Sequence, residues 1–211
     1  MMMHRRVRDA IAFVVVAAAI TIPLAAQSGT APLRLPERLH AETRDTISRL
    51  ADSLRSAGVP WEPLYAKSAE GVLKGADDAR ILRAVRSLAG ELAVARQALG
   101  QEASTAEVVA GASALHAGVP AEDLRSLAGM RPSRAGESPL AVPITVLADL
   151  VTRRVPPSVA MASISALVQR GAPDERFTTL RTDVERDILS GQAPAAAARA
   201  RSLIQSSGPP E

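Results

Sequence analysis

The sequence predicts an all-α protein, built as an irregular array of short helices stacked as helical hairpins after an N-terminal signal peptide. Apolar residues recur at helical spacing along most of the chain, and no segment alternates as a half-buried strand would. Short turns containing glycine and proline recur between these segments. Counting the segments between turns, we expect about eight or nine helices.

A tetrapeptide turn marks the junctions between the expected helices. It occurs as Ala-Gly-Val-Pro at 57–60 and 117–120, and in looser form at 153–156 and 170–173. Glycine just beyond a helix end adopts the left-handed conformation at little steric cost, and proline suits the first position of the next helix. The residue between them should meet the residue five positions back, which for Val119 is Ala114, a poor partner. The stop and start are therefore predicted more firmly than the cap itself.

The turns are evenly spaced. Gly58 and Gly75 are 17 residues apart, and Gly118, Gly136, Arg154 and Gly171 follow at intervals of 18, 18 and 17. One unit is thus a helix of about a dozen residues plus a turn. Two units approach the length of a tetratricopeptide repeat, but the side-chain pattern of that repeat is absent.

The first 26 residues have the layout of a secretory signal peptide. Three arginines at positions 5, 6 and 8 precede an apolar stretch over 10–26 that ends in small residues. We expect cleavage after Ala26 and export to the periplasm or the medium. An uncleaved membrane anchor is the alternative, but 17 residues interrupted by Pro23 are short for a membrane span.

The remainder divides by composition into a flexible spacer, two helical parts, a loop between them and a tail. We place these at 27–35 (spacer), 36–129 (N-terminal helical part), 130–138 (linker loop), 139–205 (C-terminal helical part) and 206–211 (tail). In the C-terminal part, the segments 139–151 and 158–169 contain a single charged residue, Asp149. Helices that are apolar all round belong in the interior, so these two segments predict a central hairpin.

Composition excludes several classes of function. The chain has no cysteine, so it has neither disulfides nor thiolate chemistry. Its net charge of +3 falls to +1 once Arg5, Arg6, Arg8 and Asp9 of the leader are removed. Phosphate-backbone binding needs a concentrated basic face, so we expect no nucleic-acid partner, and membrane contact only through the leader before cleavage.

The candidate interaction surface is Trp61, Glu62, Tyr65 and Lys67, which places the only tryptophan and tyrosine of the chain beside charged residues on one short helix. Aromatic residues next to polar groups are enriched at recognition surfaces. With aromatic residues at only 2% of the chain, packing of these two rings into the core is the alternative.

Asp149 is the candidate buried acid, because burial in an apolar helix would raise its pKa and suit it to catalysis or switching. The alternative is an ion pair with Arg153 at i+4. His40 and His116 have no second metal-binding residue at i+3 or i+4, and His116 fits a helix C-terminus. We therefore expect neither a metal nor a cofactor.

These features favour an exported, non-enzymatic helical protein that binds another envelope protein or serves as a structural component of the bacterial cell envelope. The alternative is an envelope hydrolase that uses acidic residues such as Asp149 or Glu70. A deep pocket with two or more acids or a histidine would favour the enzyme, whereas a shallow apolar groove would favour binding.

Overall fold

The computed structural model describes residues 34–131 and 139–206, and this part of the chain forms nine α-helices and no strand. The prediction of an all-α fold is confirmed. The helices are α1 (Ala41–Ser56), α2 (Glu62–Leu73), α3 (Asp78–Leu99), α4 (Thr105–Ala117), α5 (Ala121–Gly129), α6 (Ala141–Thr152), α7 (Pro157–Gln169), α8 (Asp174–Leu189) and α9 (Pro194–Ser206).

Several predicted segments lie outside the described residues. They are the leader at 1–26, most of the spacer at 27–35, most of the linker loop at 130–138, and the end of the tail. Within the described ranges, no helix combines the length and apolarity that crossing a membrane requires.

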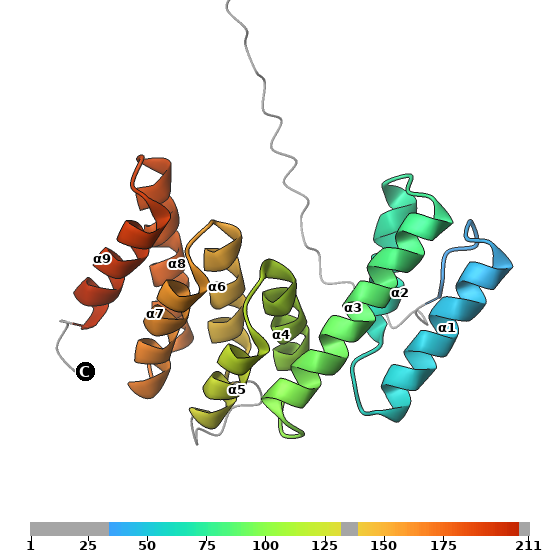
Figure 1. The fold of residues 1–211 in the computed structure, drawn as a ribbon, viewed down its shortest axis with the longest axis horizontal. Helices are drawn as coiled ribbons and strands as arrows, with labels where there is room; N and C mark the ends of the chain where they lie inside the picture. Colours follow the sequence, from blue (N-terminus) through green and yellow to red (C-terminus); the bar gives the residue numbers. More distant parts are fainter. Residues whose placement is uncertain (1–33, 132–138, 207–211) are drawn as a thin grey trace, which may run out of the picture. The chain divides into compact units, whose positions relative to one another are not determined.

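The helices of residues 34–206 follow one another in chain order (Figure 1). Every extensive packing contact in this part joins helices that are one or two positions apart in the chain. Beyond α3, contacts between alternate helices produce two rows, one made of α4, α6 and α8 and the other of α5, α7 and α9. This nearest-neighbour packing is typical of repeat arrays, in which each unit buries its apolar face against the next.

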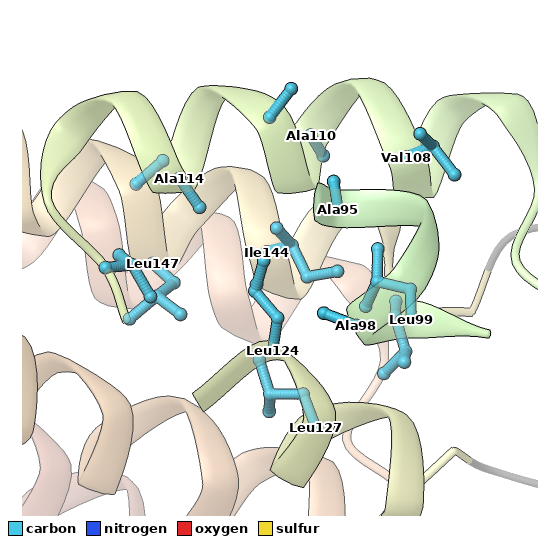
Figure 2. Close-up of a cluster of buried hydrophobic side chains, with 14 of the residues drawn as sticks. Ala95, Ala98, Leu99, Val108, Ala110, Ala114, Leu124, Leu127, Ile144 and Leu147 are labelled. Carbon is cyan, nitrogen blue, oxygen red and sulfur yellow. The ribbon is translucent and has the colours of Figure 1, made fainter. Parts of the chain in front are cut away.

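A cluster of buried hydrophobic side chains lies where α3, α4, α5 and α6 meet (Figure 2). Leucine and isoleucine side chains from α5 and α6 fill it, among them Leu124, Ile144 and Leu147, all with 0% exposure. The facing surfaces of α3 and α4 are lined instead by small residues. A Cβ at Gly111 would lie 3.0 Å from the Cβ of Ala95, so the glycine permits the close approach of these two helices. Helices from both sides of the linker loop therefore share this core.

The repeated turns are left-handed helix caps. Residues Gly58, Gly118 and Gly171 all have positive φ. The residue after each glycine donates its backbone N–H to the carbonyl five residues earlier, which belongs to Leu54, Ala114 and Leu167 respectively. A second bond runs from each glycine N–H to the carbonyl three residues back. This pair of bonds defines the Schellman motif.

The cap at Gly118 forms despite the small side chain of Ala114. The Val119 N–H lies 2.9 Å from the Ala114 carbonyl oxygen, the same distance that joins Val59 to Leu54. The cap is closed by hydrogen bonds between backbone groups, so it forms even when the side-chain contact between Val119 and Ala114 is small. The doubt placed on this cap by the sequence pattern was wrong.

The turn pattern predicted that its proline would occupy the first position of the next helix, and this prediction was wrong for the four turns at 57–60, 117–120, 153–156 and 170–173. Pro120, Pro156 and Pro173 are N-cap residues in extended geometry, and Pro60 precedes the N-cap Trp61. The fixed φ of proline is compatible with the extended N-cap conformation as well as with the helix, so the helix begins one residue later.

At the third turn, Arg154 occupies the position that glycine holds elsewhere. Its φ is 66°, and it is the one non-glycine residue with positive φ among those described. Arg154 and Val155 still make the two Schellman bonds, to the carbonyls of Val151 and Leu150. The hydrogen-bond pattern therefore forms even where the residue type disfavours it.

The two apolar segments form α6 and α7, which pack against each other. Most of their side chains are buried, including Leu147, Leu150 and Ile164 at 0% exposure. The amphipathic helix α8 packs against both α6 and α7, with Phe177 and Leu180 buried.

We predict that Gly58→Val lowers the free energy of unfolding by about 1–2 kcal/mol, because a β-branched residue is strained at positive φ. A Cβ built at Gly58 meets no atom within 4 Å, so the loss would report backbone conformation alone. Urea unfolding measures it. The matched control is Gly90→Ala inside α3, also in open space, which should gain about 0.5–1 kcal/mol. Equal stability of Gly58→Val and the wild type would contradict the left-handed cap.

Candidate functional site

An ordered aromatic cluster lies where α1 meets α2. The rings of Trp61 and Tyr65 are 5.1 Å apart between centroids and stand edge to face at 77°. The guanidinium carbon of Arg55, in the last turn of α1, lies 4.4 Å from the centroid of the Trp61 ring. Arg55 is held from its other side by Asp52, at 2.6 Å. The cluster is thus a stack of cation, indole and phenol fixed by contacts on both helices.

The two rings are only partly buried. Both pack against the hydrophobic core, yet neither polar tip has a hydrogen-bond partner among the described residues. Glu62, fully on the surface, accepts a bond from the Trp61 backbone N–H at 3.1 Å. Three of the four residues predicted for this surface therefore lie together. The structure also supports part of the alternative, since the inner sides of both rings contribute to packing.

Lys67, the fourth residue, is engaged in a separate network. Its ammonium group lies 3.0 Å from the carboxylate of Glu70, which also binds Lys74. Hydrogen bonds from Lys74 and then Lys67 lower the pKa of Glu70 to about 2. A carboxyl with this pKa stays ionised at neutral pH and is unsuited to the general-acid role considered for Glu70.

Arg55 belongs to the aromatic cluster although the sequence pattern did not indicate it. In the sequence of α1, Arg55 is one of several surface arginines, and Asp52 lies three residues before it. Only the reversal of the chain at Gly58 brings the guanidinium over the indole ring. A search for arginines just before a turn that is followed by an aromatic residue would have found it.

Asp149 is half-exposed and paired. Its carboxylate lies 3.1 Å from Arg181 of α8, whereas Arg153 binds Glu185 of α8 at 2.8 Å. The predicted ion pair between Asp149 and Arg153 was therefore wrong. Each of the two residues forms an ion pair with a residue of α8 instead. At 35% side-chain exposure, Asp149 is also less buried than its apolar surroundings in the sequence suggested.

Among the described residues the fully buried acid is Glu107, at 0% exposure, which the sequence analysis did not single out. One carboxylate oxygen accepts the backbone N–H of Ser104 at 2.8 Å, and the Ser104 hydroxyl accepts the Glu107 N–H at 3.2 Å. The other oxygen accepts from the Arg131 guanidinium at 2.6 Å and from the Leu140 N–H at 2.9 Å. Glu107 therefore ties the start of α4 to Arg131, just after α5, and to Leu140, just before α6.

These bonds decide the charge state of Glu107. Burial opposes ionisation, but the hydrogen bonds from Arg131, Ser104 and Leu140 outweigh it, so the pKa of Glu107 is lowered from its usual 4.5. The carboxylate is a structural anion.

The two histidines within the described ranges, His40 and His116, each contact one acid. His116, in the last turn of α4, lies 2.9 Å from Glu91, and its side chain is 76% exposed. His40 lies 3.0 Å from Asp78, which also accepts the His40 backbone N–H. No group of three or more potential ligands among His, Asp and Glu gathers anywhere in the described ranges.

His40 borders a hollow of about 500 Å³ that Asp77 and Asp78 also line. Both acids serve the backbone there: Asp77 caps α3 by accepting the Arg80 N–H at 2.7 Å, and the backbone N–H of His40 and the hydroxyl of Thr43 lower the pKa of Asp78. The hollow therefore contains acids and a histidine, but their hydrogen bonds are directed to helix ends.

A second hollow of about 480 Å³ lies between α7 and α9 and has a different character. Its lining is largely small and aliphatic and contains no acid. The residues are Ser158, Val159, Ala162, Ser163, Ala166, Arg199, Ser202 and Leu203. We call it the α7–α9 groove.

Taken together, the described residues form an all-α array of nine helices, with a cation-aromatic cluster on α1–α2 and an apolar groove on α7–α9. Comparisons with known proteins add no relative to this description: no family model, curated protein or solved structure matches the chain.

We predict that Glu107→Gln lowers the free energy of unfolding at pH 7 by about 2–4 kcal/mol, since it leaves Arg131 without its buried counter-charge. Because the folded-state pKa of Glu107 is below 4.5, its contribution is present above that pH and is lost as the pH falls through the folded-state pKa. The difference between wild type and variant should therefore shrink toward pH 3.

Urea unfolding at pH 7 and pH 3 measures both effects. The matched control is Glu102→Gln, an exposed glutamate before the same helix, for which we expect a change within about 0.5 kcal/mol. A Glu107→Gln effect that is equal at the two pH values would show that the carboxylate charge does not stabilise the fold.

Proposed function

We propose that the protein is exported and acts as a non-enzymatic component of the bacterial cell envelope, binding another envelope protein or serving a structural role there. The observation that carries this proposal is the half-exposed cluster of Arg55, Trp61 and Tyr65. Arginine, tryptophan and tyrosine are the residues most enriched at the energetic centres of protein interfaces.

The geometry of the cluster favours binding for a thermodynamic reason. A surface side chain loses rotamer freedom when a partner immobilises it, at a cost of about 0.5–1.5 kcal/mol for a long side chain. Arg55 is already held between Asp52 and the indole, and Trp61 is held by Tyr65 and Arg55. Part of the rotamer freedom of these side chains is therefore already lost on folding, and a partner that covers the rings binds a preorganised surface.

The alternative, an envelope hydrolase, finds less support in the geometry. Glu70 is kept ionised by two lysines, and Asp149 is paired with Arg181 outside both hollows. The hollow beside His40 favours this alternative, since it contains two acids and a histidine. Hydrolysis of envelope polymers by the purified protein, lost in Asp149→Asn or His40→Ala, would establish the enzyme in place of the binding protein.

The binding surface can be tested with a photo-crosslinking amino acid placed at Glu62, beside the rings and exposed. In cells that produce the protein from its own leader, we expect a discrete crosslinked product with one envelope protein, lost on Trp61→Ala. The matched control places the same crosslinker at Leu189 of α8, which is 82% exposed and remote in the chain. Products of equal yield at both positions, or none at position 62, would contradict the proposed surface.

Export predicts a second outcome. The mature protein recovered from the envelope fraction should begin at Gln27, because the small residues before it suit signal-peptide cleavage. N-terminal sequencing measures this. An intact Met1 on membrane-bound protein would instead establish the uncleaved anchor, and recovery only from the cytoplasm would refute export.

A further inference from the structure

The α7–α9 groove has an apolar floor. Ser163 and Ser202 are its polar residues near the middle, and their hydroxyl oxygens lie 2.5 Å apart. Each is also bonded to a carbonyl of its own helix, Val159 at 3.0 Å and Ala198 at 2.8 Å. Because these hydroxyls are satisfied by each other and by the backbone, the floor offers little to a polar ligand.

Arg199 is the single ionisable residue of the lining. It is exposed, and the described residues provide it with no ion pair or hydrogen bond. The neighbouring Arg201 differs, since Asp187 binds it through two contacts of 2.6 Å. The groove therefore presents one positive charge that no acid of the lining neutralises.

The charge is at one end of the groove. Short turns join α7 to α8 and α8 to α9, so α7 and α9 run in the same direction. Ser202 faces Ser163, and Arg199 lies one turn before Ser202, which places it toward Ser158 at the start of α7. Ser158 is exposed, and no described residue bonds its hydroxyl. The polar groups that remain available thus gather at the end of an otherwise apolar hollow.

We propose that the α7–α9 groove binds a long-chain aliphatic carboxylate, with the chain over Val159, Ala162 and Ala166 and the head group paired with Arg199. The volume of about 480 Å³ is within the usual range of roughly 300–1,000 Å³ for small-ligand pockets. A partner helix is a poorer match, because an amphipathic helix normally meets charges along both rims, whereas this groove has a single cation at one end.

Isothermal titration of the mature protein with dodecanoate, below the concentration at which it forms micelles, tests the proposal. We expect saturable binding of one molecule per chain. Arg199→Gln should weaken it on the order of tenfold, the loss of one charge-assisted contact. The control Arg176→Gln removes an exposed arginine of α8 outside the groove and should leave the affinity unchanged. Dodecyltrimethylammonium should bind more weakly than dodecanoate to the wild type, and this difference should shrink in Arg199→Gln.

Ala162→Phe tests the groove independently of charge. Ala162 is exposed, so the larger side chain should fill the hollow without disturbing the core, and binding should be lost. The matched control Ala200→Phe adds the same side chain at an exposed position of α9 outside the lining. Thermal melts of both variants check that they fold.

Three outcomes would overturn the proposal. They are absence of saturable dodecanoate binding to the wild type, binding that persists in Ala162→Phe, and a wild-type dimer in sedimentation that Ala162→Phe converts to a monomer. The last would assign the groove to a second copy of the chain. None of these outcomes bears on the crosslinking test at Glu62, so the two proposals fail separately.

Discussion

The array depends on one backbone constraint, the left-handed residue that closes a helix. At Gly58, Gly118, Arg154 and Gly171 the chain makes two cap bonds, and the next helix begins within a few residues. So short a connection turns the chain back, and each helix packs against helices one or two positions away in the chain. The extensive contacts within residues 34–206 accordingly join helices close in sequence. Alanine and glycine on α3 and α4 then allow the close approach by which a chain poor in aromatic residues still builds a core.

The junction between α5 and α6 works differently, and a side chain takes over the part that the backbone plays elsewhere. Glu107 binds Arg131, just after α5, and the Leu140 N–H, just before α6, so one carboxylate joins α4 to the end of one helix and the start of the next. Such a connection costs desolvation, which only several donors can offset. It follows that this junction depends on pH, whereas the Schellman turns, which contain only backbone groups, do not.

Features that depend on residues close in sequence were predicted correctly, whereas contacts between different helices were not. Local features came out correctly: the all-α fold and the helix stops at Gly58, Gly118 and Gly171 depend on residues within a few positions. Features set by neighbouring helices did not. Spacing suggested Arg153 as the partner of Asp149, but α8 packs on α6 and offers Arg181 at a better position. Nothing in the sequence could show that Glu107 would bind Arg131 and Leu140, which lie more than twenty residues further on.

The same nearest-neighbour packing keeps the two candidate sites apart. The aromatic cluster belongs to α1 and α2 and the groove to α7 and α9, and no extensive contact joins these pairs. In an array of this kind a change in one unit acts directly on its neighbours and reaches distant units only through the helices between them. Those helices are α3 to α6, whose side chains form a shared buried cluster, and Glu107 of α4 also binds the Leu140 N–H at the start of α6. A ligand in the groove would therefore alter the aromatic cluster only by rearranging that core, and a well-packed core resists small displacements. The two surfaces are in this sense independent, and a substitution at one leaves the chemistry of the other intact.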